Sequence, residues 1–90
     1  MICKKMIVKG RVQGVNYRYS TKVQADVFSI KGYVSNLDNG DVEILACANN
    51  EALLYEFEKQ CRKGPPYARV QELITEPVNI KNPPESFDIR

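Results

Sequence analysis

The chain has 90 residues, of which 43% are hydrophobic and 27% charged, and its formal net charge is +2. These values are typical of one globular domain, so we expect a single domain over residues 1–90. The small positive charge is far from the strongly basic balance of a typical nucleic-acid-binding protein. No long apolar run occurs and the first residues do not resemble a signal peptide, which predicts a cytoplasmic protein with no membrane segment.

The residue types that are missing also limit the chemistry. The chain contains no histidine, which excludes Ser-His and Cys-His nucleophilic catalysis and every metal site built on imidazole. Its three cysteines lack the C-x-x-C spacing of a zinc site, and no G-x-x-x-x-G-K-[ST] nucleotide-binding loop occurs. We therefore expect neither a metal ion nor any other cofactor.

The first third of the chain predicts a strand, a glycine-containing loop and a helix. Residues 3–11 alternate as a strand does, with Met6 and Val8 on the face that we expect to be buried. Apolar residues then recur at helical spacing and predict a helix over residues 18–29 that ends before Gly32. The buried stripe of this helix is predicted to consist of Tyr19, Val23, Val27 and Ile30.

The remainder predicts four more strands and a second helix. Residues 33–37 and 41–48 read as strands joined by the hairpin turn Asp38-Asn39-Gly40. Residues 51–63 predict a helix capped by Asn49-Asn50 and ended by Gly64. The buried stripe of this second helix is predicted to be Leu54, Phe57 and Cys61. The last strands are expected over residues 69–76 and 86–90.

This order is βαββαβ followed by a short final strand. It predicts an α+β two-layer sandwich, with two helices on one face of a mostly antiparallel sheet. The alternation of polar and apolar residues over 41–48 suggests that the other face of the sheet is open to solvent.

The loop from Gly10 to Arg18 is the best candidate for a functional site. Main-chain N–H groups in such a loop, together with those of the first helical turn, attract anions. In a split βαβ unit the first two strands run parallel on either side of the third, so their C-terminal ends share one edge of the sheet. Asn36, at the end of the second strand, is therefore expected near Arg18.

Two segments of the chain resemble the two motifs of the acylphosphatase family, small enzymes that hydrolyse carboxyl-phosphate anhydrides. The first is GRVQGVNYR at residues 10–18, and the second is GYVSNLDNGDVE at residues 32–43. The resemblance extends from about Met6 to Phe87. It implies the ferredoxin-like fold and acylphosphatase activity without a metal, with an acyl phosphate as substrate and inorganic phosphate as product. We expect a monomer that binds neither nucleic acid nor membrane.

The resemblance also implies roles for individual residues. Arg18 matches the arginine that holds the phosphate, and Asn36 matches the asparagine that orients the attacking water. The main-chain N–H groups expected around the phosphate are those of Gln13, Gly14, Val15, Asn16, Tyr17 and Arg18. The alternative for Asn36 is a simple turn residue. Asn16, Tyr17 and Ser35 depart from the family's usual residues, which leaves the catalytic rate and the preferred acyl group open.

Two other functions are compatible with the predicted architecture. One is an RNA-binding module, which would need aromatic side chains on the open face of the central strands. Residues 41–48 place carboxylates there instead, with no aromatic residue. The other is a non-catalytic anion-binding domain of a larger protein, against which the length of 90 residues argues. An assay with benzoyl phosphate separates the three functions.

The cysteines predict one cross-strand pair. Strand alternation places Cys3 and Cys47 on the open face of adjacent antiparallel strands, where they are candidates to lie opposite each other and form a disulfide. Cys61 is expected to be a lone thiol in the core. The alternative is that all three thiols stay reduced, as is usual in the cytoplasm.

Overall fold

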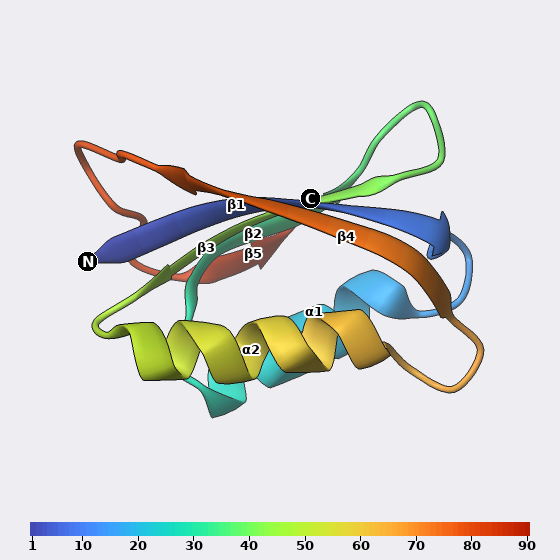
Figure 1. The fold of residues 1–90 in the computed structure, drawn as a ribbon, viewed down its shortest axis with the longest axis horizontal. Coiled ribbons are helices and arrows are strands. Elements are labelled where there is room, and N and C mark those ends of the chain that lie inside the picture. Colours follow the sequence, from blue (N-terminus) through green and yellow to red (C-terminus); the bar gives the residue numbers. More distant parts are fainter.

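The computed structural model describes all residues 1–90, as five strands and two helices. The elements are β1 (Ile2–Arg11), α1 (Tyr17–Val27), β2 (Lys31–Asn36), β3 (Val42–Ala48), α2 (Glu51–Lys63), β4 (Arg69–Val78) and β5 (Phe87–Ile89). Both helices lie on one face of a single sheet, whose strand order is β4-β1-β3-β2-β5 (Figure 1). The predicted ferredoxin-like α+β sandwich is confirmed.

The strand pairing brings distant segments to one edge of the sheet. β1 and β2 both pair antiparallel with β3, which lies between them, so their C-terminal ends point the same way. β5 adds to the outer side of β2 as a parallel strand, with Ile89 opposite Val34. The ends of β1, β2 and β5 therefore reach the same edge.

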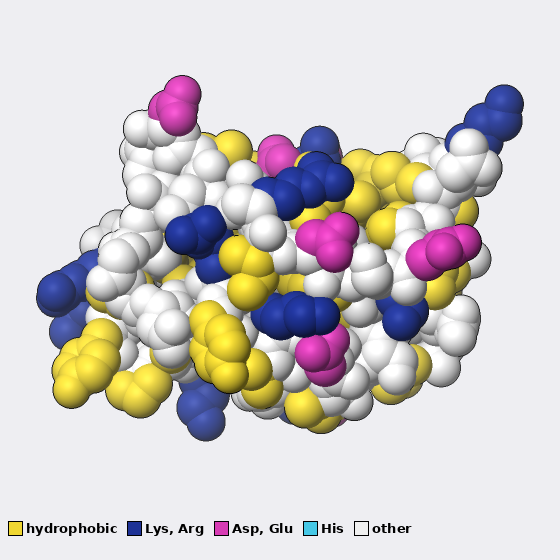
Figure 2. Space-filling model, turned by 180° about the vertical axis from the view of Figure 1, so that it is seen from behind, with side chains coloured by type: hydrophobic (Ala, Val, Ile, Leu, Met, Phe, Trp, Pro, Cys, Tyr) yellow, Lys and Arg dark blue, Asp and Glu magenta, His cyan; other side chains and the backbone are white.

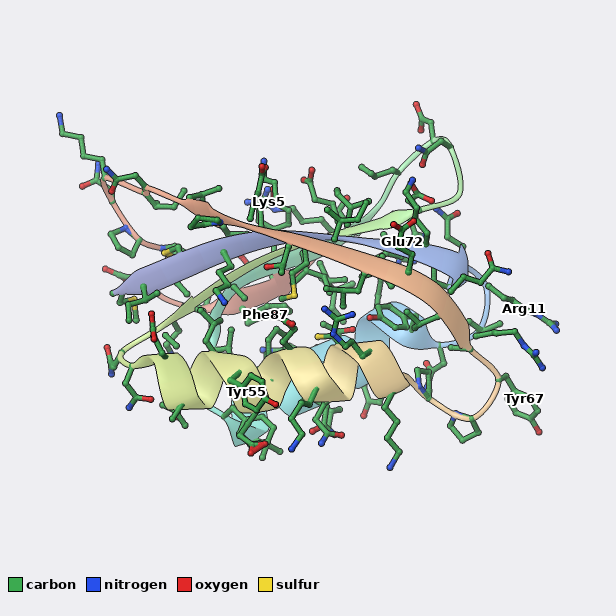
Figure 3. All side chains as sticks on the ribbon, viewed as in Figure 1. Lys5, Arg11, Tyr55, Tyr67, Glu72 and Phe87 are labelled. Atoms are coloured by element: carbon green, nitrogen blue, oxygen red, sulfur yellow. A yellow bond between two sulfur atoms is a disulfide. The ribbon has the colours of Figure 1, made fainter.

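The main core fills the space between the sheet and the helices. α2 contributes Leu54, Phe57 and Cys61, all buried, as its sequence pattern predicted. The side chain of Asn50 accepts a hydrogen bond from the Leu53 N–H at 2.9 Å, so Asn50 caps this helix. Phe87 points from β5 into the core toward the helices, whereas Tyr55 points away from the sheet (Figure 3). Neither helix combines the length and the apolar character that a membrane crossing requires.

The predicted buried stripe of α1 is wrong for its three members inside the helix, whereas Ile30, which follows the helix, is buried as predicted. Tyr19, Val23 and Val27 are exposed, and the buried positions are instead Tyr17, Thr21 and Ala25. The two sets have the same helical spacing and lie on nearly opposite faces. A pattern based on apolar residues missed the true face because Thr21 is polar. Its hydroxyl is satisfied inside the helix, where it donates to the Tyr17 carbonyl oxygen at 2.9 Å.

The predicted end of α1 is also wrong. The helix ends at Val27 instead of residue 29, and Ser29 takes the left-handed conformation, with φ of 57°. Gly32 lies inside β2 instead. A side chain at this position would collide with the Leu45 carbonyl oxygen of the neighbouring strand, so the close approach of β3 requires glycine.

The face of the sheet away from the helices is only partly open to solvent. Leu45 and Cys47 are buried there with Cys3, and this small cluster is covered by Tyr33, Val78 and Ile80. The predicted pairing of β1 with β3 is confirmed, since Cys3 lies directly opposite Cys47. The structure joins the two cysteines in a disulfide, and Cys61 is a buried free thiol.

Charges of both signs cover the surface. In the space-filling view, basic and acidic side chains are interspersed with hydrophobic ones on the face that is seen (Figure 2). This agrees with a net charge of only +2 over 90 residues.

Candidate active site

The loop between β1 and α1 carries unpaired main-chain donors. None of the N–H groups of residues 13–16 donates to a main-chain oxygen of the chain. The first N–H groups of a helix also lack an intrahelical partner, so those of Tyr17 and Arg18 extend the same array. Gly14 and Asn16 have positive φ values of 74° and 69°, which turn the backbone around this array. Unpaired main-chain donors of this kind attract anions.

Gln13 fastens this loop to the hairpin between β2 and β3. Its side-chain Nε2 donates to the carbonyl oxygens of Leu37 and Asp41, both at 2.8 Å. Asp41 in turn accepts a hydrogen bond from Lys9 Nζ at 2.7 Å. The loop is therefore attached by two hydrogen bonds to the hairpin that follows Asn36. The sequence predicted only a main-chain role for Gln13, because the position of the distant hairpin is not contained in the local pattern.

Tyr17 fixes the start of α1. Its side chain is buried, and its hydroxyl donates to the Cys61 carbonyl oxygen of α2 at 2.7 Å. Burial raises the pKa of Tyr17 well above its ordinary value of 10.0, so the hydroxyl stays protonated and keeps its donor role. This contact joins the two helices at the turn that presents Arg18.

Asn16 precedes α1 in the position of an N-cap but does not cap it. Its side chain makes no hydrogen bond to the first helical turn, and the residue is exposed. Both the helix N–H groups and the Asn16 amide therefore remain available to a ligand. Asparagine tolerates the left-handed conformation better than most residues, which explains how it stands where a small residue is expected.

Arg18 contacts Arg90, the residue that follows β5. Its Nη1 donates to the main-chain oxygen of Arg90 at 2.7 Å. A guanidinium group has five N–H donors, so this bond leaves several free to form the bidentate contacts that phosphate oxygens favour.

Asn36 lies at the end of β2 with an unsatisfied acceptor. Its Oδ1 atom is buried and has no hydrogen-bond partner in the chain. An unpaired buried oxygen is costly, by about 1–3 kcal/mol, unless a water or a ligand supplies the donor. Asn36 also lines the pocket that contains Arg18.

These residues line one pocket of about 210 Å³. Of the predicted site residues it brings together Gly14, Asn16, Tyr17, Arg18 and Asn36. Gln13 and Val15 do not line it: Gln13 makes the contacts to the hairpin, and Val15 is buried. Three residues that the sequence analysis did not assign to the site, Val12, Tyr19 and Ile89, complete the lining.

Tyr19 and Ile89 give the pocket an apolar side. Tyr19 is 59% exposed and Ile89 is 45% exposed, so both present apolar surface to a ligand. No Asp or Glu lines the pocket, and Arg18 is its one cationic side chain. The pocket thus combines donors for an anion on one side with apolar contacts on another.

Comparisons with known proteins identify the family. The family model described as Acylphosphatase matches residues 4–89. Similar proteins include the acylphosphatase of Dehalococcoides mccartyi, 49% identical over 74 residues that make up 81% of this chain and 80% of that one. The acylphosphatase of Yersinia pseudotuberculosis is 45% identical over 83 residues, which cover 92% of this chain and 89% of that one.

A solved structure agrees with these matches. The crystal structure of acylphosphatase from Bacillus subtilis superposes with a TM-score of 0.95 at 34% identity, covering 100% of this chain and 99% of that chain. The chain belongs to the acylphosphatase family.

Proposed function

We propose that the pocket between the β1–α1 loop and the end of β2 is where this acylphosphatase hydrolyses its substrate, with Arg18 and Asn36 as the catalytic residues. The observation that carries the proposal is that Arg18 and Asn36, from distant parts of the sequence, line one pocket together with the loop whose N–H groups are unpaired. One residue offers an acceptor for water, and the other offers a cation for phosphate.

The reaction needs little beyond positioning and charge stabilisation. Water attacks phosphorus, the bond from phosphorus to the acyl oxygen breaks, and the electron pair leaves with the carboxylate. A carboxylate is stable unprotonated at neutral pH, since carboxyl groups have pKa values of about 4, so no general acid is required. The proton lost by the water passes to the phosphate product or to solvent. In phosphoryl transfer the protein mainly aligns the reactants and stabilises charge on the equatorial oxygens.

The loop and Arg18 are proposed to hold the phosphoryl group. Main-chain N–H groups of residues 13–18 donate to its oxygens, and the guanidinium group of Arg18 adds charge-assisted hydrogen bonds. The unpaired donors of residues 13–16 and the free N–H groups of Arg18 support this role.

Asn36 is proposed to orient the attacking water. Its Oδ1 accepts one O–H of the water, and this contact fixes a lone pair of the water oxygen toward phosphorus. An amide is too weak a base to remove the proton, so Asn36 acts by alignment.

An assay of benzoyl phosphate hydrolysis tests the proposal. The expected result is turnover in buffer containing EDTA, with inorganic phosphate as a competitive inhibitor. Arg18→Ala and Asn36→Ala should each lose most of the activity. Asn49→Ala serves as a matched control, because Asn49 is exposed and lies outside the pocket. Phosphate binding without any turnover would instead favour a non-catalytic anion-binding domain.

We propose further that the 90-residue domain acts as a monomer on an acyl phosphate, without a nucleic-acid or membrane partner. The pocket of this single domain contains both proposed catalytic side chains, which supports this proposal. Size-exclusion chromatography with light scattering tests it, and a dimer at assay concentration would contradict it. The cytoplasmic location stays a prediction.

A further inference from the structure

The residue after β5 connects the open face of the sheet to the active-site arginine. The Arg90 N–H donates to the Val34 carbonyl oxygen at 2.8 Å, which extends the pairing of β5 with β2 by one step. The main-chain oxygen of the same residue accepts the hydrogen bond from Arg18 Nη1 at 2.7 Å. Arg90 therefore contacts both β2 and one end of the Arg18 guanidinium group through its main chain.

The side chain of Arg90 is fastened on the face away from the helices. Its guanidinium carbon lies 4.1 Å from the centroid of the Tyr33 ring, which is a cation–π contact. The Tyr33 hydroxyl donates to Glu43 Oε1 at 2.7 Å, and the ring packs on the cluster of Cys3, Leu45 and Cys47. Tyr33 is thus a fixed platform for Arg90.

The short strand β5 depends on side-chain contacts such as that of Arg90 with Tyr33 to hold its end in place. It has three residues and pairs with β2 along one edge, while its other edge has no partner strand. Segments of this kind are poorly ordered unless side chains tie them down. Arg90 is otherwise exposed, and the Tyr33 contact is the side-chain interaction that the structure gives it.

The Tyr33 hydroxyl is protonated at neutral pH, which keeps its hydrogen bond to Glu43. Burial, followed by the hydrogen bond to Glu43 and the charge of that carboxylate, raises the pKa of Tyr33 to about 12. The hydroxyl therefore remains a proton donor to Glu43 at neutral pH.

We propose that Tyr33 and Arg90 are positioning residues of the active site. Stacked on the Tyr33 ring, Arg90 holds its main-chain oxygen against Arg18 Nη1, and this contact turns the free N–H groups of Arg18 toward the phosphate loop. The inference rests on the proposed function, in which Arg18 binds the phosphoryl group. It places two residues outside the pocket lining in control of substrate affinity.

The test measures the inhibition constant of inorganic phosphate together with kcat and KM for benzoyl phosphate. Tyr33→Leu keeps apolar packing but removes the aromatic face. Because an exposed cation–π contact contributes about 0.5–1 kcal/mol, we expect the inhibition constant and KM to rise together by about 2- to 5-fold. Arg90→Ala should give the same change, and Arg90→Lys should restore part of the affinity. In the double variant the two effects should not multiply.

Two variants control for loss of packing alone. Tyr55→Leu removes a similar ring that lies 5.6 Å below Lys59 Nζ on α2, a helix that contributes nothing to the pocket. Val78→Ala removes packing from the same small cluster that Tyr33 covers, without touching Arg90. Both should keep the wild-type inhibition constant, and thermal unfolding shows that each variant is folded.

The outcomes separate this inference from the proposed function. A folded Tyr33→Leu protein with an unchanged inhibition constant overturns the inference. If Arg90→Ala weakens phosphate binding while Tyr33→Leu does not, Arg90 acts through its charge alone and the positioning role is again wrong. If Arg18→Ala itself leaves the inhibition constant unchanged, Arg18 does not bind the phosphoryl group and the proposed function is wrong. A ¹⁵N spectrum of the guanidinium groups adds a direct check, since the Arg18 signal should broaden or shift in Tyr33→Leu but not in Val78→Ala.

Discussion

Two side chains divide the proposed chemistry at the residue scale. Arg18 offers charge to a group that is anionic in both the substrate and the transition state, whereas Asn36 offers a buried acceptor to the water that attacks. The two residues come from different motifs and meet because β1 and β2 run parallel on either side of β3. Their different partners predict different kinetic defects.

We expect Arg18→Ala to raise KM and to lower kcat, because its contact with phosphate exists before and during the reaction. Asn36→Ala should lower kcat by about 10²–10³ with little change in KM, the usual cost of losing one preorganised polar contact. Steady-state kinetics with benzoyl phosphate measures both, and Asn49→Ala is the control. Near-wild-type turnover in a folded Asn36→Ala protein would show that the water is oriented by another group.

Tyr19 predicts a preference at the acyl side of the pocket. Its ring is 59% exposed beside Arg18, and the pocket offers no second cation for an acyl group that carries its own negative charge. Aromatic contacts contribute about 0.5–1.5 kcal/mol, so Tyr19→Ala should lower kcat/KM for benzoyl phosphate about 2- to 10-fold more than for acetyl phosphate. Tyr55→Ala is the matched control. Equal losses for the two substrates would mean that Tyr19 does not contact the acyl group.

At the scale of the elements, local sequence signals were sufficient to predict the bounds and buried face of α2, but not those of α1. The bounds, cap and buried stripe of α2 were all predicted, because Asn50, the apolar spacing and Gly64 act within the helix. In α1 two stripes have equal spacing, and the sheet selects the one that begins at Tyr17. The buried face also includes the Tyr17 hydroxyl contact with α2, a tertiary contact that no pattern in α1 contains.

In the candidate site, too, some residues could be predicted from the sequence and others could not. Arg18 and Asn36 could be predicted because their motifs and the strand order place them at one edge. The contributions of Ile89 and Arg90 could not be predicted. These residues reach the site through the parallel pairing of β5 with β2. The side-chain role of Gln13 likewise depends on where the distant hairpin lies.

The β1–α1 loop predicts a test at the element scale. Gln13→Ala removes two hydrogen bonds to the hairpin, each of which contributes about 0.5–1.5 kcal/mol. We expect the free energy of unfolding to fall by about 1–3 kcal/mol and the inhibition constant of phosphate to rise, because the loop loses its attachment. Gln13→Glu should lower the free energy of unfolding further, because its carboxylate would face two carbonyl oxygens. Gln24→Ala, on α1, is the control, and an unchanged inhibition constant in Gln13→Ala would contradict the anchoring role.

At the scale of the whole molecule, buried titratable groups predict a loss of stability at high pH. Burial is the largest cause that raises the pKa of Cys61 above its ordinary 9.0 and that of Tyr17 above its ordinary 10.0. Both groups are protonated in the folded chain at pH values where the unfolded chain releases protons. Their contribution is therefore fully present below pH 9 and decreases as the pH rises further.

Each such group lowers the free energy of unfolding by about 1.4 kcal/mol per pH unit above its ordinary pKa. Urea unfolding at pH 7, 9 and 10.5 measures this decrease, and Cys61→Ala should make it less steep. A free energy of unfolding that stays constant from pH 8 to pH 11 would contradict the prediction.

The disulfide predicts an effect on stability that is separate from catalysis. Cys3 and Cys47 are 44 residues apart in sequence, and closing a loop of this length stabilises the fold by about 4 kcal/mol in the chain-entropy model. Cys3 lies near the start of β1, whereas the pocket lies beyond its other end, so reduction should lower the free energy of unfolding and leave kcat/KM nearly unchanged. Mass spectrometry after alkylation in denaturant without reductant should find one labelled cysteine, Cys61. Three labelled cysteines would show that the bond does not form, and a large loss of activity on reduction would show that the two ends of β1 are coupled.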